Sequence, residues 1–328
     1  MKHAWQALYS VARATAIEGL QQTVTLLLAL TCTVLTALQP LVQLHVFGEP
    51  GRMTRDCGLA FLLVFGIFIV ALTAGFTLAR EIQDGTAATA LAKPISRTTF
   101  FLGKFFGSCA VAAAFAWCET GALLLAFRTA ENHVLTAATD ELIRDPACGL
   151  VSIFLPVLAL GAAAFVSART GRRMALWFFG LLAVLEPVAL LVLGLWARDG
   201  SWLGAAHWCS GTDLRILSLV LPLFLLLCVF AALATAFSTR LPTGPSVALS
   251  FLLLFLGFLA DATASSGGFF GRALAVFVPD VQAFWLADSL ASGGSVGAGL
   301  QLRTLLYAVL YGAAILSVGL FSFRTKDL

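Results

Sequence analysis

The sequence predicts an all-α protein that crosses a membrane several times. Of its 328 residues, 60% are hydrophobic and only 11% are charged, and the mean hydropathy is +0.95. A chain of this composition cannot cover a globular surface with solvated side chains. Helices are expected because lipid leaves no backbone group without an internal partner, and because the long uncharged runs lack the alternation of barrel strands.

The membrane spans follow from the length of these runs. A helix needs about 20 apolar residues to cross the hydrocarbon core. Six uncharged runs are long enough, and two more qualify if each contains one buried carboxylate. We therefore expect eight spans in a single domain of residues 1–328: 19–44, 57–79, 105–127, 146–168, 174–197, 216–239, 241–260 and 304–323.

The N-terminal residues 1–18 precede the first span. Trp5, Leu8, Ala12 and Ala16 recur there at helical spacing, which favours a helix lying in the plane of the headgroups. The alternative is a frayed extension of the first span.

The basic residues set the orientation. With the N-terminus inside, the cytoplasmic loops hold 12 Lys and Arg against 8 outside, as the positive-inside rule requires. Because the count of spans is even, both termini are expected in the cytoplasm of a multi-pass protein of the plasma (inner) membrane. The net charge of +3 is spread over the loops, so no nucleic-acid partner is expected.

Residues 80–104 form the most polar and patterned segment between two spans. The second span ends at Arg80-Glu81, and Asp84-Gly85 is a strong local break that lets the chain turn at the membrane surface. Thr86 is expected to cap a short alanine-rich helix over 87–92.

The end of this short helix is also marked. Lys93 lies in its last turn, Pro94 stops it, and Ser96 can cap the following helix. A short capped helix fixed between two spans would transmit displacement. The alternative is an ordinary solvated loop.

Two carboxylates fall inside predicted spans, at Glu119 and Glu186. A carboxylate in hydrocarbon must face protein or water. Pro187 beside Glu186 frees a backbone carbonyl and permits a kink. Each carboxyl is expected either to line a path for substrate or protons, or to join helices by hydrogen bonds.

Catalytic and metal motifs are absent from the sequence. Gly103-Lys104 lacks the upstream glycine of a phosphate-binding loop, and there is no nucleophile elbow or His-Glu-x-x-His. The seven cysteines form no Cys-x-x-Cys pair, so no metal site is expected. Cys57, Cys148 and Cys209 lie near the outer boundary, where a disulfide is conceivable. The chain is predicted to be a non-catalytic membrane protein without a cofactor of its own.

The longest segment outside the spans is 261–303. Its five aromatic residues, interleaved with Gly and Asp, favour the membrane interface. We expect an extracytoplasmic segment whose short helices re-enter the outer leaflet. Residues 128–145 form a smaller polar loop.

These features resemble the membrane permeases of ATP-binding-cassette (ABC) transporters of the type-2 export class. Permeases of this class carry Arg-Glu, Gly-Thr, Leu-x-x-Pro-x-Ser-Arg and Gly-Lys in the first cytoplasmic loop. The chain end is similar too, with Pro279-Asp280 and Phe284 before the last span and 321–328 after it. The loop motif is found here in the same order, as Arg80-Glu81, Gly85-Thr86, Leu91, Pro94, Ser96-Arg97 and Gly103-Lys104.

The resemblance implies a permease that works as a homodimer or heterodimer in membrane lipid, with separate subunits that bind ATP and Mg²⁺ and drive export. The loop would be the coupling helix that docks on such a subunit, through Arg80, Glu81, Asp84, Gly85, Thr86, Leu91, Lys93, Pro94 and Arg97. A second contact would map to 168–173 or 238–244. Family members commonly have six spans, so the pair 146–168 and 174–197 would be an insertion, or one run would be re-entrant.

Two other functions fit the residues. One is a secondary transporter that uses an ion gradient through Glu119 and Glu186. The other is a membrane scaffold whose loop recruits a soluble protein.

Overall fold

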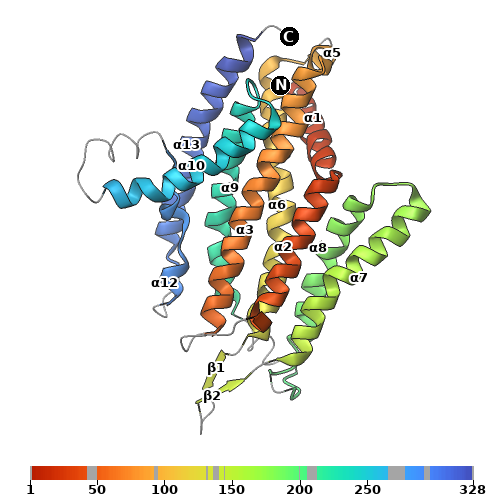
Figure 1. The fold of residues 1–328 in the computed structure, drawn as a ribbon, viewed down its shortest axis with the longest axis vertical. Helices are drawn as coiled ribbons and strands as arrows, with labels where there is room; N and C mark the ends of the chain where they lie inside the picture. Colours follow the sequence, from red (N-terminus) through yellow and green to blue (C-terminus); the bar gives the residue numbers. More distant parts are fainter. Residues whose placement is uncertain are drawn as a thin grey trace. The chain divides into compact units, whose positions relative to one another are not determined.

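The computed structural model describes residues 2–42, 50–91, 95–130, 132–135, 140–143, 145–198, 200–204, 213–264, 278–291 and 296–326. This part of the chain is mostly helical (Figure 1), which confirms the predicted all-α fold. The elements are α1 (Lys2–Leu20), α2 (Thr23–Val42), α3 (Pro50–Ala74), the π-helix η1 (Gly75–Ala79), α4 (Arg80–Gln83), α5 (Thr86–Leu91), α6 (Arg97–Thr129), β1 (Asn132–Leu135), β2 (Asp140–Ile143), α7 (Pro146–Thr170), α8 (Met174–Leu193), η3 (Leu214–Ile216), α9 (Leu217–Phe237), α10 (Thr243–Ala264), η4 (Gln282–Phe284), α12 (Ala287–Ala291) and α13 (Ala298–Arg324).

Seven helical segments among the described residues are long and apolar enough to cross a membrane: Thr23–Val42, Pro50–Gln83, Arg97–Thr129, Pro146–Thr170, Met174–Leu193, Leu214–Phe237 and Ala298–Arg324. The eighth predicted span, 241–260, belongs to α10, whose apolar stretch Thr243–Leu259 is shorter. Its apolar run stops at Asp261. Figure 1 shows α10 crossing α9 and α13 at a steep angle instead of running beside them.

The chain forms two compact units. Unit 1 comprises Met1–Leu20, Gly66–Ala113 and Leu221–Leu328, and unit 2 comprises Gln21–Phe65 and Ala114–Val220. The chain passes between the units four times, once in the turn after α1 and then within α3, α6 and α9.

Unit 2 contains a helical hairpin of α7 and α8 that packs on α2. Asp145 caps α7 by accepting a hydrogen bond from the Cys148 amide at 2.9 Å, and Pro146 occupies the first turn. Gly171, at φ +68°, ends α7 in the left-handed conformation. Cys57 and Cys148 are free thiols, whereas Cys209 lies outside the described residues.

A buried ion pair joins α6 to the start of α7 in unit 2. The Nε atom of Arg128 lies 2.7 Å from Oδ2 of Asp145, and Nη2 of Arg128 donates to the Trp196 carbonyl oxygen at 2.7 Å. Burial and the charge of Arg128 lower the pKa of nearby Arg198, which donates to the Ala130 carbonyl oxygen. No motif in the sequence indicated this pairing. Between them, β1 and β2 form an antiparallel hairpin in the predicted polar loop.

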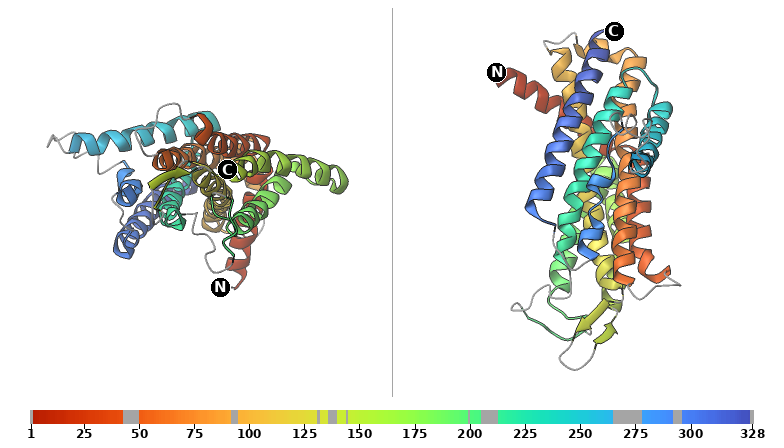
Figure 2. Two further views of the ribbon diagram at one scale, coloured as in Figure 1. Left: turned by 90° about the horizontal axis from the view of Figure 1, so that it is seen from below. Right: turned by 90° about the vertical axis from the view of Figure 1, so that its left-hand side faces the viewer.

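Unit 1 holds the N-terminal helix against α6 through two glycines. A Cβ atom on Gly103 would lie 2.6 Å from Cγ1 of Val11, and one on Gly107 would lie 2.4 Å from Cβ of Thr15. The close approach of α1 to α6 therefore depends on the absence of side chains at Gly103 and Gly107. The helix predicted over 1–18 is present, and its first turns project from unit 1 (Figure 2) with Trp5 exposed.

Gly107→Ala is expected to lower the thermal midpoint of unfolding. The new methyl group would also lie 2.8 Å from the backbone oxygen of Ala12, so the helices must separate, at a cost of about 1–3 kcal/mol. Gly161→Ala is the matched control, because nothing lies within 4 Å of a Cβ atom there. Thermal unfolding of the purified proteins, followed by size-exclusion chromatography, compares the two. Equal midpoints would contradict the close packing of α1.

Candidate functional site

The predicted coupling segment, residues 80–104, begins with a π-helical turn. Helix α3 continues through η1 into α4, and such turns are frequent at functional sites. Gly75 opens η1, and a Cβ atom there would lie 2.4 Å from Cγ2 of Thr243 at the start of α10. The wider turn therefore sits where α10 presses against the helix. No periodicity in the sequence indicated it.

The break at Asp84-Gly85 is formed as the sequence predicted. Gly85 has φ +72°, a conformation that glycine adopts without strain. Helix α5 follows, beginning at Thr86. The Thr86 hydroxyl donates to the Glu81 carbonyl oxygen at 3.2 Å. This hydrogen bond connects the start of α5 to α4, and no bond between this hydroxyl and an α5 amide is observed among the described residues.

A partly buried ion pair connects the two ends of the segment. Nζ of Lys104 lies 2.8 Å from Oε1 of Glu81, and the Lys104 side chain is only 6% exposed. The ammonium group also lies 5.4 Å from the ring centroid of Phe100, a cation–π distance. From the sequence, Glu81 was expected to contact the nucleotide-binding subunit, and Lys104 was named only as part of the loop motif. The signal in the sequence was that Arg80-Glu81 and Gly103-Lys104 both belong to the loop motif.

Arg97 contacts its own chain. Its Nη1 atom donates to the carbonyl oxygens of Arg324 and Lys326, each at 3.0 Å, and Arg324 donates to the Thr98 hydroxyl at 2.7 Å. Lys326 in turn donates to the Thr239 carbonyl oxygen at 2.8 Å. These bonds fix the start of α6 to the end of α13.

Arg240, in the turn after α9, completes this arrangement. Its Nε and Nη2 atoms donate to Ser322, and Nη2 also donates to the Thr325 hydroxyl at 2.9 Å. Cations at the carbonyl end of a helix compensate its dipole. We call the four residues Arg97, Arg240, Arg324 and Lys326 the C-terminal clamp. The sequence assigned a docking role to Arg97 by residue, whereas Arg324 and Lys326 belong to the similar chain end 321–328 and Arg240 belongs to the possible second contact 238–244.

The outer face of the segment is open. The side chains of Arg80 and Asp84 are 70% and 61% exposed and lie 3.9 Å apart. On α5, Thr86, Ala88 and Thr89 are exposed and Ala87 is buried. Leu91 is the last residue of α5. Lys93 and Pro94, which the sequence assigned to the same site, lie outside the described residues.

A hydrophobic cluster supports the segment from inside. Leu78, Phe100, Phe101 and Phe323 are buried together, and Val11 of α1 packs against them. The cluster therefore joins η1, α6, α13 and α1 at one end of unit 1.

The two intramembrane carboxyls lie in unit 2. Glu119 on α6 and Glu186 on α8 are buried and interact electrostatically with each other. The Thr36 hydroxyl donates to Oε1 of Glu119. A Cβ atom on Gly121 would lie 2.5 Å from Oε2 of Glu186.

Within the part of the chain that the structure describes, Oε2 of each carboxyl has no hydrogen-bond partner. The pair could accept donors from a passing molecule or hold a proton. Among the described residues, no group of His, Cys, Asp and Glu has the composition of a metal site.

The comparisons with known proteins add one finding. The model of one family, described as "ABC-2 family transporter protein", matches residues 6–199. This range runs from α1 into the chain beyond α8 and includes residues 80–104, Glu119 and Glu186. No curated protein gives a significant match.

Proposed function

The chain belongs to the ABC-2 transporter family, since the match covers more than half of it, and from this premise we propose that it is the permease subunit of an ABC exporter. A separate nucleotide-binding subunit would bind ATP and Mg²⁺, and this chain would convert the movement of that subunit into passage of a substrate. The permease would act as a homodimer or heterodimer.

One observation carries the proposal: α5 is an exposed helix whose flanking elements are tied together. Glu81 on α4 is paired with Lys104 on α6 at 2.8 Å, so an ion pair links the two spans that flank α5. A force applied to Ala88 or Thr89 would therefore reach both spans. Arg80 and Asp84 extend the open face to which a partner would bind.

The proposed orientation follows from the same end of unit 1. Val11 of α1, Leu78 before the coupling segment and Phe323 near the end of α13 belong to one cluster. If α5 meets a cytoplasmic ATPase, both termini are cytoplasmic as well. The protein would then lie in the plasma (inner) membrane with α1 at the cytoplasmic interface, where the exposed Trp5 is favoured.

We propose that the segment 261–303 is extracytoplasmic and re-entrant; its residues 265–277 and 292–295 lie outside the described residues. The Asp280 amide donates to the Tyr307 hydroxyl at 3.0 Å, and the ring of Phe284 packs edge-on against Tyr307. Tyr307 lies about 14 Å along α13 from Ala298 at 1.5 Å per residue, near the middle of a span. The contacts of 278–291 with this level of α13 support re-entry.

Glu119 and Glu186 are proposed to line the translocation path. Family membership favours ATP-driven transport over an ion-coupled mechanism that uses these carboxyls. Their unpaired oxygens would serve as acceptors for a substrate.

Ala88→Arg is expected to abolish co-purification of the nucleotide-binding subunit. Ala88 is exposed on α5, so arginine fits without disturbing the fold but alters the docking face. The tagged protein is purified from its host membranes, and the partner is identified by mass spectrometry and ATPase activity. Ala147→Arg, at an exposed alanine in the first turn of α7, should retain the partner. Unchanged recovery with Ala88→Arg would refute docking at α5.

A further inference from the structure

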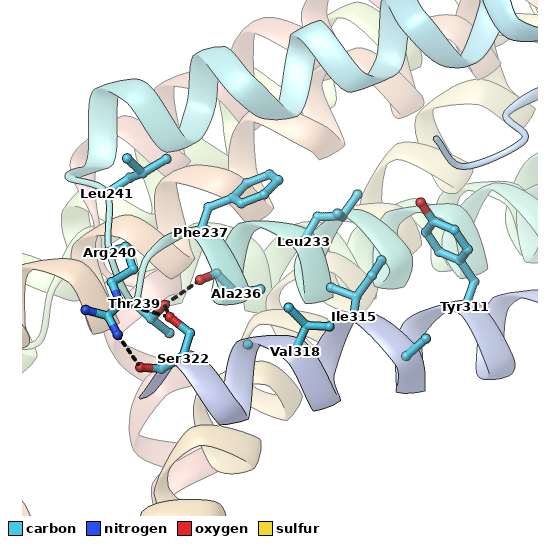
Figure 3. A pocket seen from close by; sticks show the side chains of 12 residues that line it. Leu233, Ala236, Phe237, Thr239, Arg240, Leu241, Tyr311, Ile315, Val318 and Ser322 are labelled. Atoms are coloured by element: carbon cyan, nitrogen blue, oxygen red, sulfur yellow. Dashed lines mark hydrogen bonds between the residues drawn. The ribbon is translucent and has the colours of Figure 1, made fainter. Parts of the chain in front are cut away.

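Unit 1 has a groove between α9 and α13 that the transport proposal does not use. Its volume is about 430 Å³, and its lining is almost entirely apolar. Figure 3 shows Leu233, Phe237, Ile315 and Val318 along the groove, with Arg240 and Ser322 at one end and Tyr311 toward the other. The groove is thus apolar along its length and cationic at one end.

At the cationic end, no carboxylate of the described residues is bonded to the cations of the C-terminal clamp. Among the described residues, the four members of the C-terminal clamp donate only to carbonyl and hydroxyl oxygens and to no carboxylate. Arg240 uses Nε and Nη2 in these bonds, which leaves Nη1 for another acceptor. Burial and the neighbouring charge of Arg240 lower the pKa of Lys326, so the two cations lie close enough to repel. An anion placed there would relieve this repulsion.

The dimensions of the groove match one leaflet. From Tyr311 to Ser322 the α13 wall extends about 16 Å at 1.5 Å per residue, and half of the hydrocarbon core is about 15 Å. Val318 on this wall is 71% exposed, so the groove opens toward the lipid side of α13. An acyl chain could enter it sideways from the bilayer.

We propose that the groove holds one acyl chain of an anionic glycerophospholipid, whose phosphate lies at Arg240. The apolar walls bind the chain, and the guanidinium donates to the phosphate oxygens while it still caps α13. Charge complementarity with Arg240 and the length of the α13 wall favour this lipid over a helix from a second copy. The site goes beyond the proposed transport function and does not depend on an ATPase partner.

The test titrates the purified, detergent-solubilised full chain with dioleoylphosphatidylglycerol, dioleoylphosphatidylcholine or inorganic phosphate and counts bound lipid by native mass spectrometry. Wild type is expected to bind the phosphatidylglycerol at least five-fold more tightly than the phosphatidylcholine. Ala314→Trp should weaken phosphatidylglycerol binding at least five-fold, because Ala314 lines the groove. Ala313→Trp is the matched control, since Ala313 is also exposed but does not line it.

Arg240→Gln distinguishes the contribution of the lipid headgroup to binding from that of the acyl chain. It should remove the preference for phosphatidylglycerol and leave phosphatidylcholine binding within two-fold of wild type. A preference that persists in Arg240→Gln, or equal lipid binding by Ala314→Trp and Ala313→Trp, would overturn the proposal. So would tight binding of inorganic phosphate alone.

The same spectra report the oligomeric state. Loss of a dimer in Ala314→Trp, with lipid binding unchanged, would assign the groove to a second copy instead. Elution of each variant as a single folded species on size-exclusion chromatography shows that the comparison concerns folded protein.

Discussion

Glu81→Arg is expected to reduce ATP-driven transport at least ten-fold while the protein still inserts into the membrane. The substitution places a second cation beside Lys104, whose Nζ now lies 2.8 Å from a carboxylate oxygen. Two like charges 4 Å apart repel by about 4 kcal/mol at an effective dielectric constant of 20. Helix α4 must then separate from α6, and α5 loses its fixed position.

The measurement uses proteoliposomes that contain the permease and its ATPase subunit. The charge exchange Glu81→Lys with Lys104→Glu should restore a substantial part of the transport, because the pair is re-formed with its ends reversed. Arg303→Glu is a control for a charge reversal of the same size and opposite sign away from the pair, since Arg303 is exposed near the start of α13. Wild-type transport in Glu81→Arg, or no recovery in the exchange variant, would show that the pair does not couple the helices.

Arg128→Met is expected to destabilise the protein by about 3–5 kcal/mol, because it leaves the carboxylate of Asp145 buried without its counter-ion. The two side chains are 1% and 6% exposed and bonded at 2.7 Å, so little water reaches the carboxylate, and the charge of nearby Arg198 is left as partial compensation. The loss is measured as a fall in the thermal midpoint of the purified protein.

Arg215→Met is the matched control in the same unit. Its pair with Asp213 is 2.9 Å long, but the Arg215 side chain is 56% exposed, and exposed pairs contribute about 1 kcal/mol or less. Arg128→Met combined with Asp145→Leu should recover part of the loss, since the stranded charge is removed. If both single variants unfold at the same temperature, the buried pair is not a stabilising element.

The local features of the fold were predictable because they depend on neighbouring residues. Long apolar runs predicted the all-helical membrane fold, and the Asp84-Gly85 break predicted the turn before α5. Seven of the eight predicted spans correspond to helices long enough to cross the membrane. Each of these features is encoded within about 25 consecutive residues.

The remaining features depend on residues far apart in the chain. The π-helix η1 lies where Gly75 meets Thr243, and Arg97 binds a carbonyl 227 positions away. Hydropathy could not predict the crosswise course of α10, because direction within a bundle is decided by packing. The assignment of Arg97 to a partner remains a prediction, although its guanidinium already binds the end of α13.

The division into two units has a consequence for biosynthesis. Unit 1 draws on three separate stretches of chain, the last of which ends beyond Phe323. During synthesis Phe100 and Phe101 are made more than 200 residues before Phe323, so their aromatic partner is absent for about two thirds of translation. Unit 2 can close once Val220 has been inserted. A nascent chain that stalls between Val220 and Phe323 would thus hold a complete unit 2 and an incomplete unit 1.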